Sequence, residues 1–418
     1  MSQSLTCVAL LLTAAWTAFG VLFLRGARQL RHLDEELDRE SQGPVPATGT
    51  GAVPSLAVVV TARNEAGAIE GTVRSLMRQR HPALHVVVVD DRSTDATPSV
   101  LSRLAAEADA RLEVVRIEVL PDGWLGKCHA CHAGARRARG DWILFMDGDV
   151  TLAREDLLER TVALAARRGI DHLPILPDMR PTGLMQGALL ANFEQGLLLH
   201  GRFWEMDRDR PRGGSGVGAF NLVRRAAYDR VGGHTLLKME VAEDYKLGML
   251  LKESGARQRL WSGLGVVACP WLRGVAEMMR GLEKNFFGGV GYSLWTVAWQ
   301  TSLAAILQIG PLLLALFGGS LWLALPWLVQ QGFLVAILRS ESDRLGHPAP
   351  ALWLAYPLAV PLILFAYWNS ALKTLAQGGI HWRDTFYPLA ALKAGAVRPG
   401  DWRRRGGRGP VALSEDRL

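Results

Sequence analysis

The sequence has little cysteine, little charge and none of the usual phosphate loops. Only four of its 418 residues are cysteine, too few and too scattered for a secreted disulfide framework. Charged residues make up only 21% of the chain. The G-x-G-x-x-G and Walker patterns are absent where a phosphate loop would need them. We therefore expect a protein of a reducing compartment that is not built around a glycine-rich phosphate loop.

One local cysteine pattern allows three interpretations. Residues 128–132 read Cys-His-Ala-Cys-His, which matches the C-x-x-C-H of covalent haem attachment and contains residues that bind zinc. Haem attachment needs an extracytoplasmic site, whereas the basic residues described below place this segment in the cytoplasm. No second ligand pair follows at zinc-finger spacing. We therefore expect these residues to lie in an ordinary helix.

The apolar residues, 49% of the chain, are concentrated near its two ends. Residues 5–24 form an apolar run without a charge, and this run is long enough to cross a hydrocarbon core of roughly 30 Å. A cleaved signal peptide is the alternative, but no positive residue precedes this run and no convincing cleavage site follows it. The run is followed by Arg25, Arg28 and Arg31, which by the positive-inside rule place the soluble domain in the cytoplasm. Residues 1–30 are thus predicted to be a transmembrane anchor.

Further apolar stretches cover residues 294–338, broken by Gly318-Gly319-Ser320, and residues 351–368. They predict two or three spans within residues 294–370, an interfacial or connecting segment at 271–293, and a basic tail at 371–418. The tail contains Arg403, Arg404, Arg405 and Arg408, which favours the cytoplasm. Three strictly alternating spans would contradict this, so one stretch, such as residues 295–300, is then expected to lie in the interface or re-enter. We expect a multi-pass protein of the inner (cytoplasmic) membrane.

The chain is basic, with a formal net charge of +7 and a pI near 9.5. Many of the basic residues flank apolar segments, so attraction to anionic lipid headgroups explains the charge. No nucleic-acid motif accompanies it, and we expect no nucleic-acid partner.

Between the membrane segments the pattern is that of an α/β domain at residues 55–270, after a linker at 31–54. Short β-branched runs alternate with amphipathic stretches, which indicates a parallel sheet covered by helices on both faces. The predicted strands are residues 56–61, 85–90, 112–116 and 142–146, and the predicted helices are residues 68–79, 94–108 and 128–139.

Polar residues follow three of these strands directly. They are Arg63-Asn64-Glu65, Asp90-Asp91 and Asp147-Gly148-Asp149. Ligands of open α/β sheets bind outside the carboxyl ends of the strands, so we expect the three clusters to share one rim.

Asp147-Gly148-Asp149 is the clearest metal candidate. Two carboxylates one residue apart can both reach Mg²⁺ or Mn²⁺, which prefer oxygen ligands and complete their shell with water and phosphates. A plain turn is the other interpretation of Asp-Gly-Asp, but the position after an apolar strand favours the metal.

Other acidic and glycine-rich stretches have both a structural and a functional interpretation. Residues 93–95 can cap a helix, whereas adjacent Asp90 and Asp91 need a ligand, a donor or a cation to offset their repulsion. Glu243-Asp244 can complement a helix dipole or supply a base that deprotonates an acceptor hydroxyl. Residues 213–220 are glycine-rich and let backbone approach a ligand, or form a flexible loop. Lys127 can neutralise phosphate charge or be solvated.

Together these motifs resemble glycosyltransferase family 2, inverting enzymes with an A-type nucleotide-sugar-binding fold, over roughly residues 56–260. The resemblance implies a divalent cation at Asp149 and Asp147, and Asp244 as general base with Glu243 on the acceptor side. It also implies donor contacts by Ala62, Asn64, Glu65, Asp91, Lys127 and Asp147.

Within that family, the flanking helices and residues 123–127, Gly-Trp-Leu-Gly-Lys, resemble membrane enzymes that glycosylate lipids. These are the hopanoid-associated glycosyltransferases and, more distantly, ceramide glucosyltransferases. Residues 378–387 resemble a W-[KR]-G-R-x-Y motif through Trp382, an acceptor-side candidate, but Asp384 and Thr385 stand where Gly and Arg are expected. The nearest match to the [QR]-x-x-R-W motif of processive synthases is residues 277–281, Glu-Met-Met-Arg-Gly, which argues against a polysaccharide polymerase.

The sequence thus predicts an inverting, metal-dependent glycosyltransferase that moves a sugar from a nucleotide sugar to a membrane lipid, hopanoid or carotenoid-like. The alternatives are a non-catalytic nucleotide-sugar-binding membrane protein and a processive polysaccharide synthase. A nucleotidyl or phosphoryl transferase would need a phosphate loop or a second metal cluster, which the sequence does not show.

Overall fold

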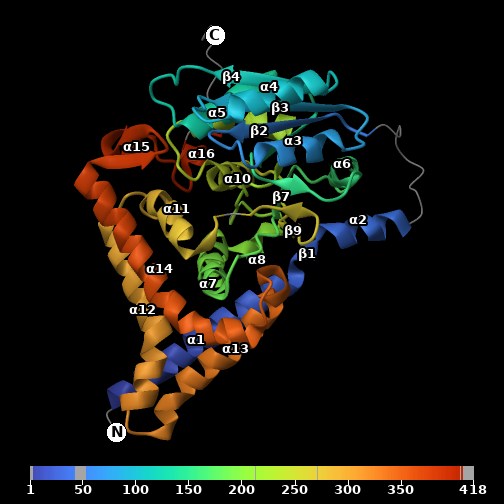
Figure 1. The fold of residues 1–418 in the computed structure, drawn as a ribbon. Helices are drawn as coiled ribbons and strands as arrows, with labels where there is room; N and C mark the ends of the chain where they lie inside the picture. Colours follow the sequence, from blue (N-terminus) through green and yellow to red (C-terminus); the bar gives the residue numbers. More distant parts are fainter. Residues whose placement is uncertain (1–2, 43–52, 212, 271, 405, 408–418) are drawn as a thin grey trace. The chain divides into compact units, whose positions relative to one another are not determined.

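The computed structural model of the chain describes residues 3–42, 53–211, 213–270, 272–404 and 406–407. The chain forms two compact units, each assembled from three separate stretches. The sheet unit comprises Leu30–Met179, Gly201–Trp271 and Ala391–Leu418. The helical unit comprises Met1–Gln29, Arg180–His200 and Leu272–Ala390. Figure 1 labels the elements of both units.

The sheet unit is built on an eight-stranded sheet in the order β1-β9-β7-β8-β5-β2-β3-β4. Strand β8 runs antiparallel to β5 and β7, and the other neighbouring strands are parallel. The predicted α/β class with a mostly parallel sheet is therefore confirmed. The strands are β1 (Arg31–His32), β2 (Leu56–Ala62), β3 (Leu84–Asp91), β4 (Leu112–Ile117), β5 (Trp142–Asp147), β7 (His172–Leu176), β8 (Asn221–Arg224) and β9 (Trp261–Ser262).

Both faces of the sheet are covered by helices. Successive side chains of a strand point to opposite faces, so each strand contributes to two cores. In β2, Val58 and Val60 belong to the core that also contains α3 (Ile69–Met77), α4 (Thr97–Glu107) and α6 (Leu157–Arg167). Val59, the residue between them, belongs to the opposite core. That second core contains residues of α5 (Gly126–Arg137), α9 (Arg225–Arg230) and α10 (Glu243–Glu253). A two-stranded sheet, β6 (Thr151–Leu152) with β10 (Val267–Ala268), and the short elements α8 (Phe203–Met206), η1 (Gly233–Leu236) and α16 (Asp401–Arg404) complete the unit.

The four predicted strands are present, and each ends one residue later than expected. The helix expected from residue 94 instead begins at Thr97. Its preceding turn is held by side chains: Asn64 Oδ1 accepts the backbone N–H of Thr94 at 2.8 Å, and Asp95 Oδ1 accepts that of Thr97 at 2.9 Å. Residues 93–96 therefore form a loop at the sheet rim.

The predicted linker at 31–54 is wrong for its first part. Residues 31–42 form strand β1, which pairs with β9, and helix α2 (Leu33–Gln42). Leu33 and Leu37, one turn apart, are buried in the sheet core, and buried Glu36 pairs with Arg168 at 2.6 Å. The rest of the expected linker, residues 43–52, lies outside the described residues.

Among the residues that the structure describes, the helical unit contains four helices long and apolar enough to cross a membrane, which fits a membrane protein. They are α1 (Gln3–Gln29), α12 (Leu294–Phe317), the stretch Leu321–Leu345 formed by η2 (Leu321–Ala324) and α13 (Leu325–Leu345), and α14 (Ala349–Gln377). The C-terminal region thus supplies three candidate spans. Two shorter helices belong to the same unit: α7 (Leu184–Gly201), which bonds α14 through Asn192 and Tyr356, and α11 (Gly274–Gly289), which Figure 1 shows beside α14.

Residues 371–418, expected to be a basic tail, are largely structured in the part that the model describes. Helix α14 continues to Gln377, followed by the hairpin β11 (Gly379–Trp382) and β12 (Thr385–Pro388), and by α15 (Leu389–Gly395). Val397 and Trp402 are buried in the second core of the sheet unit. Arg405 and Arg408 lie outside the described residues.

Candidate functional site

The polar ends of β2, β3 and β5 meet at one edge of the sheet. In the parallel register, Ala62 of β2 pairs with Asp90 of β3, and Thr61 pairs with Asp147 of β5. The prediction that the three clusters share a rim is confirmed, and the strand ends bring the donor and metal candidates together.

Two arginines offset the repulsion between Asp90 and Asp91. Arg92 Nε donates to Asp91 Oδ1 at 2.7 Å, and Arg63 Nη1 donates to the Asp91 backbone carbonyl at 3.1 Å. Asp90 Oδ1 accepts the backbone N–H of Ser93 at 3.1 Å. Asp91 is therefore a buried carboxylate whose negative charge is balanced by two neighbouring arginines.

The expected nucleotide-contact turn is rigid. Asn64 adopts a left-handed backbone conformation, with φ of 55°. Its N–H donates to Ser93 Oγ at 2.9 Å, and the N–H of Glu65 donates to Thr97 Oγ1 at 2.8 Å. The side-chain oxygen of Asn64 accepts a hydrogen bond from the loop after β3, so Asn64 holds the turn after β2 against that loop.

The two carboxylates of the metal candidate have different surroundings. The backbone N–H of Asp147 donates to Gly218 O at 3.1 Å, which ties the end of β5 to the glycine-rich stretch. Burial and the neighbouring Asp147 raise the pKa of Asp149 to about 6. A cation beside Asp149 would stabilise the charged form of this carboxylate, and carboxylate oxygens are ligands that suit Mg²⁺ or Mn²⁺.

The described residues place no cluster of three or more His, Cys, Asp or Glu side chains that could hold a metal ion. Asp147 and Asp149 would therefore supply two carboxylates, and water and substrate phosphates would complete the shell. This donor set fits a cation that binds together with a nucleotide diphosphate.

Lys127, at the start of α5, connects the two acidic groups of the site. Its Nζ lies 2.7 Å from Asp147 Oδ1 and 2.9 Å from Glu243 Oε1. Burial alone would lower the pKa of Lys127, but Asp147, Glu243 and Asp244 raise it well above its usual value. The ammonium is therefore a fixed positive charge between β5 and α10.

Glu243 and Asp244 begin α10 but differ in role. The side chain of Glu243 is only 5% exposed and pairs with Lys127, and burial raises its pKa to about 7 although Lys127 opposes the shift. Asp244 is half-buried, and its Oδ1 accepts the backbone N–H of Tyr245 at 2.7 Å. Of the two, Asp244 is the more exposed carboxylate.

Glycines let the loop before β8 lie directly against these side chains. A Cβ at Gly218 would be 2.8 Å from Asp147 Oδ2, 3.0 Å from Asp244 Oδ2 and 3.3 Å from Lys127 Nζ. A Cβ at Gly216 would be 2.1 Å from the Asp244 backbone oxygen. Glycine is required at 216 because backbone lies there, whereas a Cβ at 218 would press only on the ends of side chains, so Gly218 is the backbone position that lies closest to the acidic groups of the site.

Residues 57–232 match the family described as Glycosyl transferase family 2. Strands β2 to β8 and the helices between them are therefore similar to this family, over less than half of the chain. A 4,4'-diaponeurosporenoate glycosyltransferase of Staphylococcus aureus strain bovine RF122 / ET3-1 is 27% identical over 239 residues, 57% of this chain and 62% of that protein. The same enzyme of strain USA300 is 26% identical over the same length. The match thus spans less than two thirds of the length of these relatives.

The chain is also similar to a solved structure. A mannosyltransferase of Pyrobaculum calidifontis, solved in complex with GDP-Man and Mn²⁺, superposes with a TM-score of 0.50 at 22% identity. The alignment covers 89% of this chain and 99% of that one. The likeness shows the A-type glycosyltransferase fold.

Several candidates lie outside the matched residues 57–232, and Glu243 and Asp244 are among them. Trp382 belongs to hairpin β11–β12 of the helical unit, where Lys284 Nζ lies 4.1 Å from its ring centroid. Residues 277–281 lie in α11 of the same unit. Cys128 and Cys131 are buried in α5, and Cys128 Sγ donates to Glu240 O at 3.2 Å, in keeping with their assignment to an ordinary helix.

The sequence interpretation missed the contributions of Arg63, Arg92 and Gly218. Arg92 directly follows the acidic end of β3, a signal that could have found it, whereas Arg63 follows β2, which ends at Ala62. Gly218 is one glycine among several in residues 213–218, and its spacing alone does not distinguish it.

Proposed function

We propose that the chain is an inverting, metal-dependent glycosyltransferase that moves a sugar from a nucleotide sugar to a membrane lipid. The observation that carries the proposal is the meeting of Asp147, Lys127, Glu243 and Asp244 around Gly218 at the carboxyl edge of the sheet. The Lys127 ammonium lies there between two carboxylates, and the half-buried Asp244 and the second metal candidate Asp149 are nearby.

The donor binds across the strand ends. The base and ribose of the nucleotide contact the turn Ala62–Glu65 and Asp91, which Arg63 and Arg92 hold in place. Lys127 lies where it can balance diphosphate charge once the donor displaces part of its contact with Asp147. The P. calidifontis mannosyltransferase was solved with GDP-Man, which supports a nucleotide-sugar donor.

Asp149 and Asp147 would hold Mg²⁺ or Mn²⁺. The cation would stabilise negative charge on the leaving nucleoside diphosphate. Its support here is the raised pKa of Asp149 and the all-oxygen donor pair.

Asp244 removes the proton of the acceptor hydroxyl, and the acceptor oxygen attacks the anomeric carbon on the face opposite the leaving group, so the configuration inverts. Glu243 is unsuited to this step, because its ion pair with Lys127 holds it inside the protein. We assign Glu243 the role of positioning Lys127 and the start of α10.

The acceptor is a lipid, carotenoid-like or hopanoid. The four apolar helices and the name of the S. aureus relatives, which act on diaponeurosporenoate, support this. The basic residues Arg25, Arg28 and Arg31 support a cytoplasmic sheet unit at the inner membrane.

In the sequence, Leu272–Ala390 lies between two stretches of the sheet unit. A single unit lies on one side of the membrane, so Leu272–Ala390 must cross the membrane an even number of times. One of its three candidate spans therefore does not complete a crossing.

The decisive experiment measures nucleoside diphosphate release by the protein in lipid nanodiscs, with nucleotide sugars, Mn²⁺ and a membrane-lipid extract. Asp244→Asn should abolish lipid glycosylation and leave donor binding intact, and Asp149→Ala should abolish metal-dependent turnover. Asp109→Asn is the matched control, because Asp109 only pairs with Arg111 at the surface. Lipid glycosylation retained in Asp244→Asn would exclude it as the base. Donor binding without turnover in the wild type would indicate the non-catalytic alternative.

A further inference from the structure

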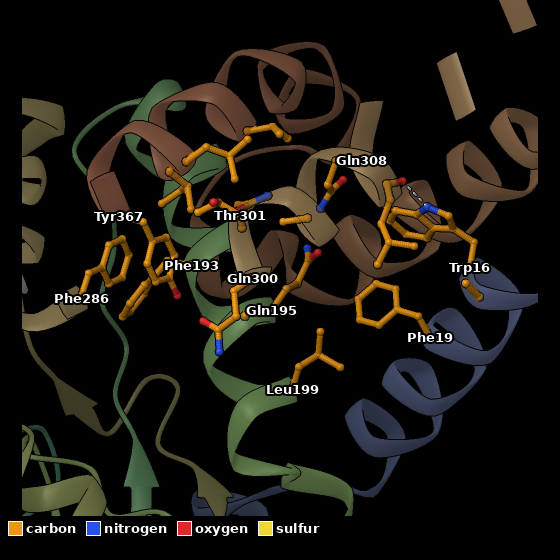
Figure 2. A pocket seen from close by; sticks show the side chains of 18 of the residues that line it. Trp16, Phe19, Phe193, Gln195, Leu199, Phe286, Gln300, Thr301, Gln308 and Tyr367 are labelled. Atoms are coloured by element: carbon orange, nitrogen blue, oxygen red, sulfur yellow. Dashed lines mark hydrogen bonds between the residues drawn. The ribbon is translucent and has the colours of Figure 1, made fainter. Parts of the chain in front are cut away.

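The helical unit contains a cavity of about 450 Å³, within the size range of small-molecule sites. It lies among α1, α7, α11, α12 and α14, all within this one unit. Figure 2 shows Trp16 and Phe19 at one end, and Phe193, Phe286 and Tyr367 at the other. The rings of Phe286 and Tyr367 stack at 4.0 Å.

No charged side chain lines this cavity in the described part of the chain. Its polar lining consists of amides and hydroxyls, namely Asn192, Gln195, Gln300, Thr301, Gln308 and Tyr367. A phosphate or an ionised carboxylate placed here would be buried without a counter-charge, at a cost of several kcal/mol. The cavity therefore favours an uncharged ligand.

One amide in the lining is aligned but unsatisfied. The Tyr356 hydroxyl accepts from Asn192 Nδ2 at 2.8 Å and Gln308 Nε2 at 3.5 Å, so its single proton goes to Gln195 Oε1 at 3.0 Å. That bond turns the Gln195 amide so that Nε2 is its free end. The Gln195 side chain is buried, with 3% of its surface exposed, and Nε2 has no hydrogen-bond partner among the described residues.

We propose that this cavity binds an uncharged lipid whose hydroxyl or carbonyl oxygen accepts a hydrogen bond from Gln195 Nε2. Its apolar body packs against the aromatic rings at the two ends. A buried amide donor within apolar helices is costly unless a ligand oxygen meets it, and a neutral oxygen meets it without burying charge. The inference is independent of the catalytic proposal, because binding is measured without donor or turnover.

The test uses the full chain in phosphatidylcholine nanodiscs and a diazirine-bearing hexadecanol as photoprobe, with the labelled residues located by mass spectrometry. Labelling should fall on the cavity lining. Gly196→Leu should abolish it by filling the cavity, because a Cβ there meets no atom within 4 Å and the variant should fold. Gly332→Leu is the matched control, since Gly332 has the same open surroundings but lies outside the lining.

The amide is tested separately. Gln195→Leu should weaken labelling about threefold to tenfold, the value of one hydrogen bond within a membrane. Gln331→Leu removes a different helix–helix bond, to Trp353 Nε1, and should leave labelling unchanged. Equal labelling of the lining by a diazirine phosphatidylcholine, or by a diazirine fatty acid at pH 9, would overturn the proposal of an uncharged ligand. Unchanged labelling in Gly196→Leu would overturn the site itself.

Discussion

Replacing Gly218 with alanine tests the proposed catalytic geometry with a single methyl group. The new Cβ would lie 2.8 Å from Asp147 Oδ2 and 3.0 Å from Asp244 Oδ2, where ordinary contact begins at 3.4 Å. The two carboxylates must therefore retreat by about 0.6 Å and 0.4 Å. Both oxygens end side chains that can move, so the fold should persist.

The displacement should be expensive for catalysis. A misplacement of about 1 Å at a reacting group costs about a hundredfold in rate, so shifts of roughly half that size predict a loss of about tenfold in kcat. Donor affinity should change less, because Asp91 and the turn after β2 lie on neighbouring strands.

The assay is nucleoside diphosphate release in nanodiscs with lipid extract, together with donor binding and the thermal unfolding midpoint. Gly67→Ala is the control, because a Cβ at Gly67 meets no atom within 4 Å. A folded Gly218→Ala protein with wild-type kcat would refute the placement of Asp147 and Asp244 in one site.

Three further outcomes are expected. Lys127→Met should leave buried Glu243 and Asp147 without their counter-charge, lower the unfolding midpoint and reduce donor affinity at least tenfold in a binding titration; unchanged affinity would remove Lys127 from the donor site. Burial lowers the pKa of His172 to about 4, against an unfolded value of 6.5. The free energy of unfolding should therefore be fully retained above pH 6.5 and should fall by up to about 3 kcal/mol as the pH drops toward 4. In unfolding experiments at a series of pH values, His172→Gln should show a weaker fall. Gly20→Leu should lower the unfolding midpoint of the protein in detergent, because its Cβ would lie 2.1 Å from the Phe333 ring, whereas Gly332→Leu should not.

The sheet was predictable because its central strands are continuous apolar runs. The four valines at residues 86–89 have no polar alternation, so they indicate a strand buried on both faces, and its polar ends then mark one rim. Asp91 and Asp147 could be placed together by this reasoning alone.

Contacts between distant segments were not predictable. Strand β1 is two residues long and is held by β9, more than two hundred residues later in the chain, so residues 31–42 read as a charged linker. Lys127 gave no sign of its two partners, because Asp147 and Glu243 reach it from other elements. Side-chain pairing of this kind depends on tertiary packing, which local pattern does not encode.

Val397 and Trp402 are buried in the sheet unit, so part of its core comes from residues that are made late in synthesis. The backbone N–H of Val397 donates to Glu240 Oε2 at 2.8 Å, and Lys246 Nζ donates to its carbonyl at 2.5 Å, beside the start of α10. These residues leave the ribosome only after all four candidate spans have been made. Residues made after the candidate spans therefore support the start of α10, which carries the proposed base, so we expect the site to be completed only once those spans have been made.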